Sequence, residues 1–345
     1  MCTHPLTIKN PYYGIGDKGL NALHNTHSQF ISVPCGQCKQ CLSMRQAWFN
    51  QRVQMESLRS ELFMITLTYN DLVPRINFKG YQLQFPDYRD IQNMCKRIRK
   101  KGWKFRYWFC SEYGRKHKRP HFHGLIAIDR NDYPDLHWSV LEQTFSKLFL
   151  DHWSVNVGSR QNPKYKPLLT YVKQRNKCTY DFHHVEAVPG HDNDLSFYCS
   201  KYVLKYDVRT DKLLKKILLD PVLDEHQTSL LYGLIKPRSV MSKDFGDYDY
   251  PDIKKYISIC LSRSRDLPQF YDLHTGASSL LSPYYRKHLV PFDYQKSILQ
   301  RLSIMYDSMC IDDELSILEQ NIDASLRTRH EFGLKRIKRL CSSKY

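Results

Sequence analysis

The feature that most constrains the fold is an alternation of strand-like and helix-like segments between residues 61 and 207. Phe63–Tyr69 is rich in β-branched and aromatic residues and is followed by Asn-Asp, which predicts a strand that ends in a turn. From Tyr88 to Lys101 the apolar residues recur at helical spacing, which predicts a helix. By the same patterns we expect strands at Trp103–Phe109, at His121–Ile128, near Val155 and at His183–Val188, and helices at Ser139–Leu150 and Asp194–Tyr206.

Taken along the chain, these segments predict an α+β fold in which helices pack on a central antiparallel sheet. Residues 1–60 hold a cysteine cluster followed by a predicted helix at about Leu42–Arg59, and residues 208–345 have a mostly helical pattern. We therefore expect three domains: an N-terminal cysteine-rich segment over residues 1–60, an α+β domain over residues 61–207, and a C-terminal helical region whose role the sequence does not reveal.

The chain is strongly basic, because 52 Lys and Arg residues exceed 35 Asp and Glu residues and give a formal net charge of +17. Such a charge attracts polyanions, either nucleic acid or an anionic membrane surface, with an affinity that falls as salt rises. The 24 Tyr, 16 Phe and 5 Trp residues suit stacking on unpaired bases, which favours nucleic acid. The chain has no apolar run of about 18 residues and no apolar signal core at its start, so we expect no membrane contact and a cytosolic location.

One set of candidate metal ligands lies on two neighbouring predicted strands. His121 and His123 alternate along a strand, so both imidazoles share one face of the sheet and can hold one divalent cation. Glu112 ends the preceding strand, and a hairpin between the two strands would bring its carboxylate to the histidines. Two imidazoles and a carboxylate suit Mg²⁺ or Mn²⁺. The alternatives are strand histidines that only form hydrogen bonds, and a Glu112 carboxylate that pairs with Arg115 or Arg119.

A second candidate set has the helical spacing of Tyr198, Lys201, Tyr202 and Lys205. Residues four apart lie on one helix face, so the tyrosines would lie one turn apart with lysines beside them. A tyrosine phenol has a pKa of about 10, and a nearby ammonium favours its ionised, nucleophilic form. Attack on a DNA phosphate would leave a 5′-phosphotyrosine and a free 3′-hydroxyl that can prime a polymerase. The alternative is an aromatic stripe buried against the sheet, which leaves the two lysines unexplained.

Three parts of the chain together resemble the HUH endonuclease superfamily of replication initiators, relaxases and single-strand transposases. They are Phe63–Asn70, Ser111–Gly114 with Arg119–Ile126, and Tyr198–Lys205. The paired pattern Tyr-x-x-Lys-Tyr-x-x-Lys is similar to that of the replication initiators of small single-stranded DNA bacteriophages. The start of the chain, with Cys2 and Pro34–Cys41, resembles the microvirus branch, in particular the gokushoviruses and chlamydia phages.

The resemblance implies a rolling-circle DNA replication initiator that nicks and rejoins single-stranded DNA at a replication origin, in the cytoplasm of an infected bacterial host. It implies an α+β domain with a ferredoxin-like antiparallel sheet, a divalent cation on His121 and His123, and nucleophiles at Tyr198 and Tyr202. Glu112 matches an acidic ligand of replication initiators. The sequence leaves open whether a host helicase and polymerase take part.

The cysteine cluster predicts a second metal site. Cys35, Cys38 and Cys41 are spaced Cys-x-x-Cys-x-x-Cys, with Cys2 as the expected fourth ligand and His4 as its substitute. Thiolates at this spacing suit tetrahedral Zn²⁺, here in a structural site that would anchor the first residues of the chain. An iron–sulfur cluster and plain reduced thiols are the alternatives.

Basic residues near the predicted metal ligands are candidates for contacts with DNA phosphates, and a tryptophan among them is a candidate for base stacking. These candidates are Lys96, Arg97, Arg99, Lys100, Lys101, Trp103, Arg115, Lys116, Lys118 and Arg119. The alternative for any of these residues is a solvated basic surface, for instance at the end of a helix.

Two rival functions stay open. A non-catalytic zinc-containing protein that binds single-stranded DNA or RNA would explain the charge, the aromatic residues and the cysteines. It would leave the strand histidines and the tyrosine–lysine array without a role. A single-tyrosine relaxase or transposase would use only one of the two tyrosines.

Overall fold

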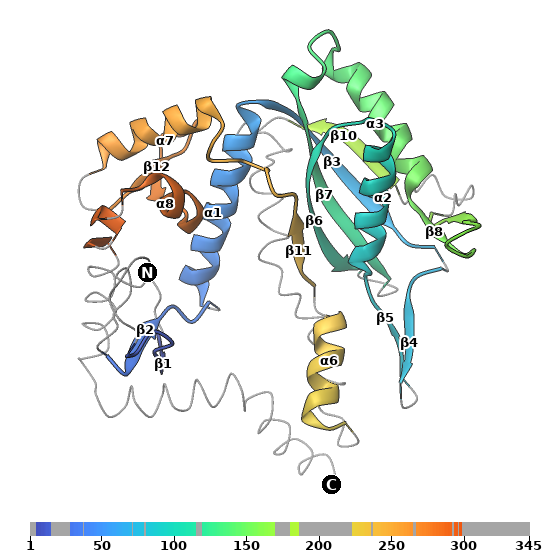
Figure 1. Cartoon of the computed structure of the whole chain (residues 1–345), viewed down its shortest axis with the longest axis horizontal. Helices are drawn as coiled ribbons and strands as arrows, with labels where there is room; N and C mark the ends of the chain where they lie inside the picture. The colour runs from blue at the N-terminus through green and yellow to red at the C-terminus, as the bar shows by residue number, and fades with distance from the viewer. Residues whose placement is uncertain are drawn as a thin grey trace. The chain divides into compact units, whose positions relative to one another are not determined.

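The computed structural model describes residues 5–14, 28–36, 38–70, 72–78, 81–114, 119–169, 180–185, 223–235, 237–264, 267–291, 293–295 and 297–298 (Figure 1). The chain forms two compact units. The sheet unit comprises Arg52–Leu214 and Asp224–Asp247, and the terminal unit comprises Met1–Gln51, Lys215–Leu223 and Tyr248–Tyr345. The three domains expected from the sequence, with boundaries at residues 60 and 207, stay a prediction.

The centre of the sheet unit is a five-stranded sheet with the strand order β10-β3-β7-β6-β11 (Figure 1). Every pair of neighbouring strands in it is antiparallel. The strands are β3 (Ser60–Thr68), β6 (Arg106–Tyr113), β7 (Pro120–Asp129), β10 (Tyr180–Val185) and β11 (Ser239–Met241). This arrangement confirms the predicted α+β fold with a central antiparallel sheet.

Helices α2 (Tyr88–Lys100) and α3 (Trp138–His152) cover one face of this sheet. The Asp87 side chain caps the start of α2 by accepting a hydrogen bond from the backbone amide of Arg89. Basic residues fill the last turn of α2, as the helix dipole favours. The apolar sides of both helices join strand residues in one buried cluster, so the main core of the unit lies between the helices and the sheet.

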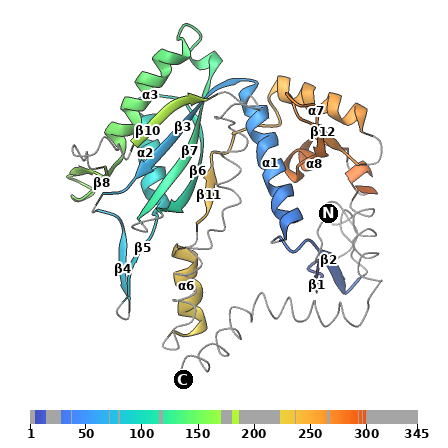
Figure 2. The ribbon, with the colours of Figure 1, turned by 180° about the vertical axis from the view of Figure 1, so that it is seen from behind.

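Strand β7 divides its side chains between the two faces of the sheet, because successive strand residues point to opposite sides. Phe122 and Ile126 are buried in the cluster under the helices. His121 and His123 point to the opposite face, which is turned toward the viewer in Figure 2. Gly124 lies on the helix side, where a Cβ atom would come within 2.4 Å of the Phe109 ring. The lack of a side chain there lets the aromatic core pack directly on β7.

The remaining elements are short hairpins and helices. In the sheet unit they are β4 (Arg75–Phe78), β5 (Tyr81–Gln84), the 3-10 helix η2 (Arg130–Asp132), β8 (Ser154–Asn156), β9 (Tyr165–Pro167) and α6 (Glu225–Ile235). In the terminal unit they are β1 (Leu6–Lys9), β2 (Phe30–Val33), α7 (Pro251–Arg263), β12 (Gln269–Tyr271), β13 (Ser278–Leu280) and α8 (Pro283–Leu289). Helix α1 (Lys39–Ser57), predicted at Leu42–Arg59, contains the unit boundary at Gln51. Among the helices that the structure describes, none combines the length and the apolar character needed to cross a membrane.

The strand predicted at Trp103–Phe109 begins later than expected, at the start of β6. Gly102 follows α2 with a φ of 91°, a left-handed conformation that favours glycine and turns the chain away from the helix. The Trp103 ring then stacks on Tyr133. The backbone amide of Lys104 donates a hydrogen bond to the Tyr133 hydroxyl at 2.8 Å instead of to a neighbouring strand.

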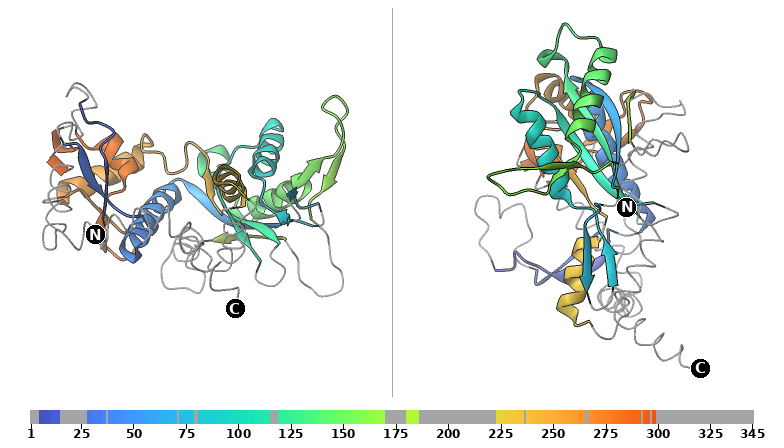
Figure 3. Two further views of the ribbon diagram at one scale, coloured as in Figure 1. Left: turned by 90° about the horizontal axis from the view of Figure 1, so that it is seen from below. Right: turned by 90° about the vertical axis from the view of Figure 1, so that its right-hand side faces the viewer.

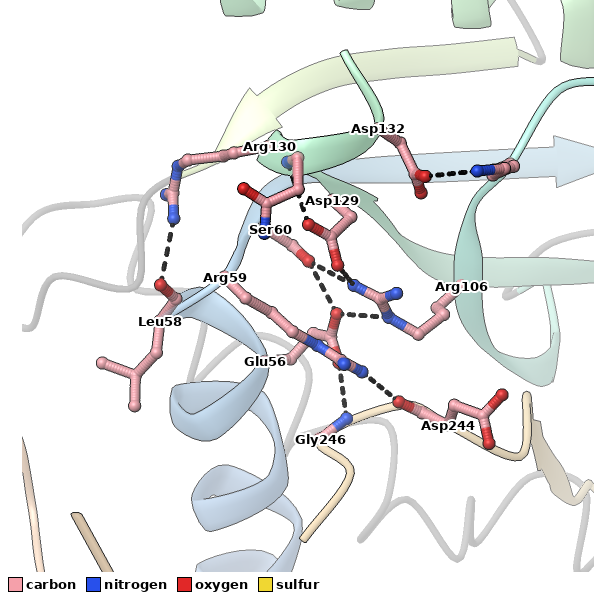
Figure 4. Close-up of polar contacts among 12 residues, drawn as sticks. Glu56, Leu58, Arg59, Ser60, Arg106, Asp129, Arg130, Asp132, Asp244 and Gly246 are labelled. Carbon is pink, nitrogen blue, oxygen red and sulfur yellow. Dashed lines mark hydrogen bonds and ion pairs between the residues drawn. The ribbon is translucent and has the colours of Figure 1, made fainter. Parts of the chain in front are cut away.

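A buried ionic network ties the end of α1 to the central sheet (Figure 4). The Glu56 side chain has 0% exposed surface and accepts hydrogen bonds from Arg106 Nε and Ser60 Oγ, each at 2.7 Å. Arg106 Nη2 donates to Asp129 Oδ2 at 3.0 Å, and the backbone amide of Gly246 donates to Glu56. Because these charged groups are largely removed from water, each stabilises the fold only while its partners are present.

Glu56→Ala should lower the free energy of unfolding of the sheet unit by about 3–5 kcal/mol, because Arg106 then stays buried without its nearest carboxylate. Urea unfolding followed by tryptophan fluorescence measures this loss. Asp132→Ala is the matched control, since it removes the carboxylate of the exposed Lys104–Asp132 ion pair and should cost far less. Equal losses in the two variants would mean that the buried network does not hold the unit together.

Candidate metal centre

Glu112, His121 and His123 converge on the face of the sheet that α2 and α3 leave open. Glu112 lies directly across from His121 in the β6–β7 pairing, and His123 follows two residues further along β7. Glu112 Oε2 lies 3.3 Å from His123 Nε2 and 3.7 Å from His121 Nε2. The three ligand atoms all lie within 4.8 Å of one another. The structure thus brings these three predicted residues together through a hairpin, and we call them the metal triad.

Both imidazole rings are held from behind, at the nitrogen that faces away from Glu112. His123 Nδ1 lies 3.2 Å from Thr66 Oγ1, across the β3–β7 pairing. His121 Nδ1 lies 3.4 Å from the carbonyl oxygen of Arg119, which can accept a hydrogen bond only when this nitrogen carries the proton. A proton on Nδ1 leaves the Nε2 lone pair free to bind a metal, and such outer contacts fix the ring orientation.

The chemistry of the metal triad fits a divalent cation. Two imidazoles and a carboxylate are accepted ligands, and the carboxylate neutralises part of the metal charge. The His121, Glu112 and His123 side chains are 16%, 12% and 9% exposed, so the ligands are shielded from bulk water without being sealed. Three protein donors leave further positions of an octahedral ion such as Mg²⁺ or Mn²⁺ for water or for substrate oxygens. The metal triad could therefore hold an ion and still reach a substrate.

Thr66→Val should weaken Mn²⁺ binding by about 10- to 100-fold, because valine keeps the shape of threonine but cannot hold His123 Nδ1. Calorimetric titration of the full chain with Mn²⁺ measures the change. Thr68→Val is the control, because Thr68 lies on the same strand face opposite His121 and its hydroxyl makes no hydrogen bond to either histidine. An unchanged Mn²⁺ affinity in Thr66→Val would contradict the orienting role of Thr66.

The terminal unit holds a second candidate metal site, at Cys35, Cys38 and Cys41. Cys35 Sγ and Cys41 Sγ lie 3.9 Å apart, and two sulfurs on one tetrahedral Zn²⁺ with bonds of about 2.3 Å would lie about 3.8 Å apart. The backbone amides of Cys38 and Cys41 point at the sulfurs of Cys35 and Cys38, at 3.3 and 3.5 Å, which favours the thiolate form. None of the three forms a disulfide. This cluster could bind zinc.

The basic residues predicted near the metal ligands lie mostly elsewhere. Helix α2 and the residues after it pack on the opposite face of the sheet from the metal triad. Arg97 and Arg99 donate hydrogen bonds to backbone carbonyls of neighbouring segments, and Trp103 packs against aromatic side chains. The exposed lysines of this run are Lys96, Lys100 and Lys101. The run therefore does not flank the metal triad, and DNA binding by its residues stays a prediction.

Arg119 is the one predicted DNA-binding residue described next to the metal triad. Its guanidinium donates a hydrogen bond to the carbonyl oxygen of Tyr69 at 2.9 Å, at the end of β3. The other predicted residues lie outside the described part of the chain, as does the predicted helix Asp194–Tyr206. They are Cys2, Arg115, Lys116, Lys118, Tyr198, Lys201, Tyr202 and Lys205.

Sequence reasoning missed Thr66 as a partner of the metal triad. The available signal was its place in β3, where it is a polar residue between the buried Ile65 and Leu67. Alternation puts its side chain on the face opposite these two apolar neighbours. The pairing of β3 with β7, which the sequence does not specify, decides that the histidine across from it is His123.

Comparison with known proteins gives a match for the segment that carries the metal triad. No curated protein and no solved structure matches this chain. Residues 62–207 match a family model whose description is that of a replication-associated protein of the ORF2 type. This segment is less than half of the 345 residues, and it contains β3, β6 and β7 together with the metal triad and both predicted tyrosines. The match supports a replication-associated protein of a rolling-circle initiator family.

Proposed function

We propose that this protein starts rolling-circle DNA replication by nicking single-stranded DNA at an origin with a tyrosine nucleophile, and that it later rejoins the strand. The observation that carries the proposal is the convergence of Glu112, His121 and His123 within 4.8 Å inside the segment that resembles replication-associated proteins. The cysteine pattern at the start of the chain favours an initiator of the microvirus type, acting in an infected bacterium. In this proposal the cysteine cluster binds a structural Zn²⁺ and takes no part in catalysis.

The proposed chemistry follows from the two candidate sets of residues. A divalent cation on the metal triad would neutralise charge on the scissile phosphate and orient it for displacement. The phenolate oxygen of Tyr198 or Tyr202 attacks phosphorus, and the bond from phosphorus to the 3′ oxygen breaks. The leaving oxygen takes up a proton and becomes a 3′-hydroxyl, while the 5′ phosphate stays on tyrosine. Reversal of the same steps rejoins the strand, and Lys201 and Lys205 favour the phenolate.

The described tyrosines around the metal triad are poor nucleophiles. Burial raises the pKa of the Tyr88 phenol to about 12, and burial also raises the pKa values of Tyr69 and Tyr113 well above their usual range. All three side chains are buried and donate hydrogen bonds within the core. A phenol that is hard to ionise and shielded from DNA cannot attack a phosphate efficiently, which supports the choice of Tyr198 and Tyr202.

The proposal is tested with the full chain and labelled single-stranded oligonucleotides of randomised sequence. In the presence of Mn²⁺, a denaturing gel should show labelled DNA bound covalently to the protein, and removal of the metal with EDTA should abolish this band. Binding to the DNA without any covalent band would favour the rival, a non-catalytic single-strand-binding protein.

A further inference from the structure

A basic hairpin arm leaves the sheet unit close to the metal triad. The arm, Ser154–Pro167, consists of β8, β9 and the loop between them, and it projects away from the sheet (Figure 3). It carries Arg160, Lys164 and Lys166 and no acidic residue. The chain average of +17 over 345 residues would give a segment of this length only about +0.7 instead of +3. Every residue from 159 to 167 is exposed, so this excess charge faces solvent.

The arm is rooted at the end of β3 that lies beside the metal triad. Trp153, immediately before the arm, donates its indole N–H to the carbonyl oxygen of Thr68 at 3.0 Å. Asn70 donates from its side chain to the carbonyl oxygen of Pro167 at 2.8 Å. Thr68 pairs with His121 across β3 and β7. The root of the arm and a ligand of the metal triad are thus joined through one strand pairing.

The loop of the arm is ordered by its own polar contacts. Asn156 Oδ1 accepts hydrogen bonds from the backbone amides of Gly158 and Lys164, each at 2.9 Å. Ser159 Oγ accepts one from the backbone amide of Asn162 at 2.9 Å. A Cβ atom on Gly158 would come within 2.4 Å of the Asn162 carbonyl oxygen, so the turn closes tightly. An ordered arm loses less conformational entropy when it binds a ligand than a loose loop does.

Tyr165 gives the arm an aromatic surface held in place from α2. The Arg97 guanidinium lies 4.9 Å from the centre of the Tyr165 ring, and Arg97 itself donates to the carbonyl oxygens of His152 and Ser154. Half of the Tyr165 surface, 50%, is nevertheless exposed. A fixed, half-exposed ring beside lysines suits stacking on an unpaired base.

We propose that the arm Ser154–Pro167 binds the single-stranded DNA next to the scissile phosphate, with Arg160, Lys164 and Lys166 on its phosphates and Tyr165 on a base. This role rests on the proposed nicking function and names a positioning surface for its substrate. Single-stranded DNA fits better than duplex, because the bases of a duplex are already stacked on one another and only an unpaired base can stack on Tyr165.

The test compares the full chain with the variant Arg160→Gln, Lys164→Gln, Lys166→Gln. Binding of a fluorescein-labelled oligothymidylate is measured as a function of salt, with EDTA present so that no cleavage occurs. For single strands each lost phosphate contact reduces the slope of log affinity against log salt by about 0.7, so the slope should fall by about 2. Tyr165→Ala should weaken binding by about 5- to 100-fold, and Tyr165→Phe should restore it because phenylalanine also stacks.

The matched control removes three exposed lysines of similar charge far along the sequence, in the variant Lys243→Gln, Lys255→Gln, Lys287→Gln. If this control loses as much affinity and slope as the arm variant, the arm has no specific role. If both Tyr165 variants bind as the wild type does, or if the arm variant loses affinity only for duplex DNA, the assignment to single-stranded DNA is wrong. Nicking by the wild type is measured separately, so an unaffected arm variant of an active enzyme overturns the arm alone. A wild type that forms no covalent band overturns the nicking function itself.

Discussion

His123→Ala should slow metal-dependent nicking of single-stranded DNA by at least about 1,000-fold. His123 Nε2 is the imidazole nitrogen nearest to Glu112, at 3.3 Å, so its loss leaves one imidazole and one carboxylate to hold the cation. A metal ion that neutralises phosphate charge supplies several kcal/mol to the transition state, and each loss of about 1.4 kcal/mol costs a factor of ten in rate. Formation of the covalent protein–DNA band in Mn²⁺, followed over time on denaturing gels, measures the rate.

The control for this prediction is another histidine on the same face of the sheet. His183 lies on β10, pairs with Asp181 at 3.2 Å and is separate from the metal triad, so His183→Ala should nick at nearly the wild-type rate. Glu112→Gln keeps the shape of the glutamate and removes its charge, and it should behave like His123→Ala if the carboxylate binds the cation. Wild-type rates in both triad variants would remove the metal triad from catalysis, whatever the fate of the tyrosines.

The triad could be predicted from the sequence because its geometry depends on local patterns. The alternation of His121 and His123 around the buried Phe122 fixes their common face, since a strand has a period of two. The preceding strand is joined to theirs by a short basic loop, and an antiparallel hairpin then places Glu112 across from His121. Each step needs only residues that are near in sequence.

The surroundings of the triad could not be predicted, because they depend on pairings between distant segments. Thr66 reaches His123 only because β3 and β7 are neighbours in the sheet, although many residues separate them in the sequence. Likewise, Arg97 and Arg99 look like the other residues of a basic run until the fold shows the backbone carbonyls that they bind. A count of charges distinguishes neither case, which is why the basic run was expected beside the metal ligands and lies on the other face.

The late start of β6 has a similar cause. Trp103 and Phe105 alternate with Lys104 and Arg106 as in a strand, but a strand also needs a neighbour for its backbone. The segment after α2 instead makes its contacts with Tyr133, which lies far ahead in the sequence. The pattern of side chains was therefore sufficient to predict the strand but not the residue at which it begins.

The double variant Tyr198→Phe, Tyr202→Phe should form no covalent protein–DNA band, while its affinity for single-stranded DNA stays within about twofold of the wild type. Phenylalanine keeps the ring and loses only the hydroxyl oxygen that would attack phosphorus, so the reaction stops and stacking or packing persists. The band is measured with labelled DNA in Mn²⁺, and the affinity is measured in EDTA with the same DNA. Tyr206→Phe is the matched control, because Tyr206 continues the same four-residue spacing and is not expected to attack.

The two single variants distinguish the proposed initiator from a single-tyrosine relaxase or transposase. In rolling-circle replication one tyrosine holds the old 5′ end while the other cuts the next copy, so either Tyr198→Phe or Tyr202→Phe alone should still form the covalent band. A repeated cycle of cutting and joining on a circular single strand should then fail in each, because no second hydroxyl accepts the strand. If one single variant loses the band completely and the other keeps the full cycle, only one tyrosine is the nucleophile. A band retained in the double variant would place the nucleophile elsewhere and leave the tyrosine–lysine array without a catalytic role.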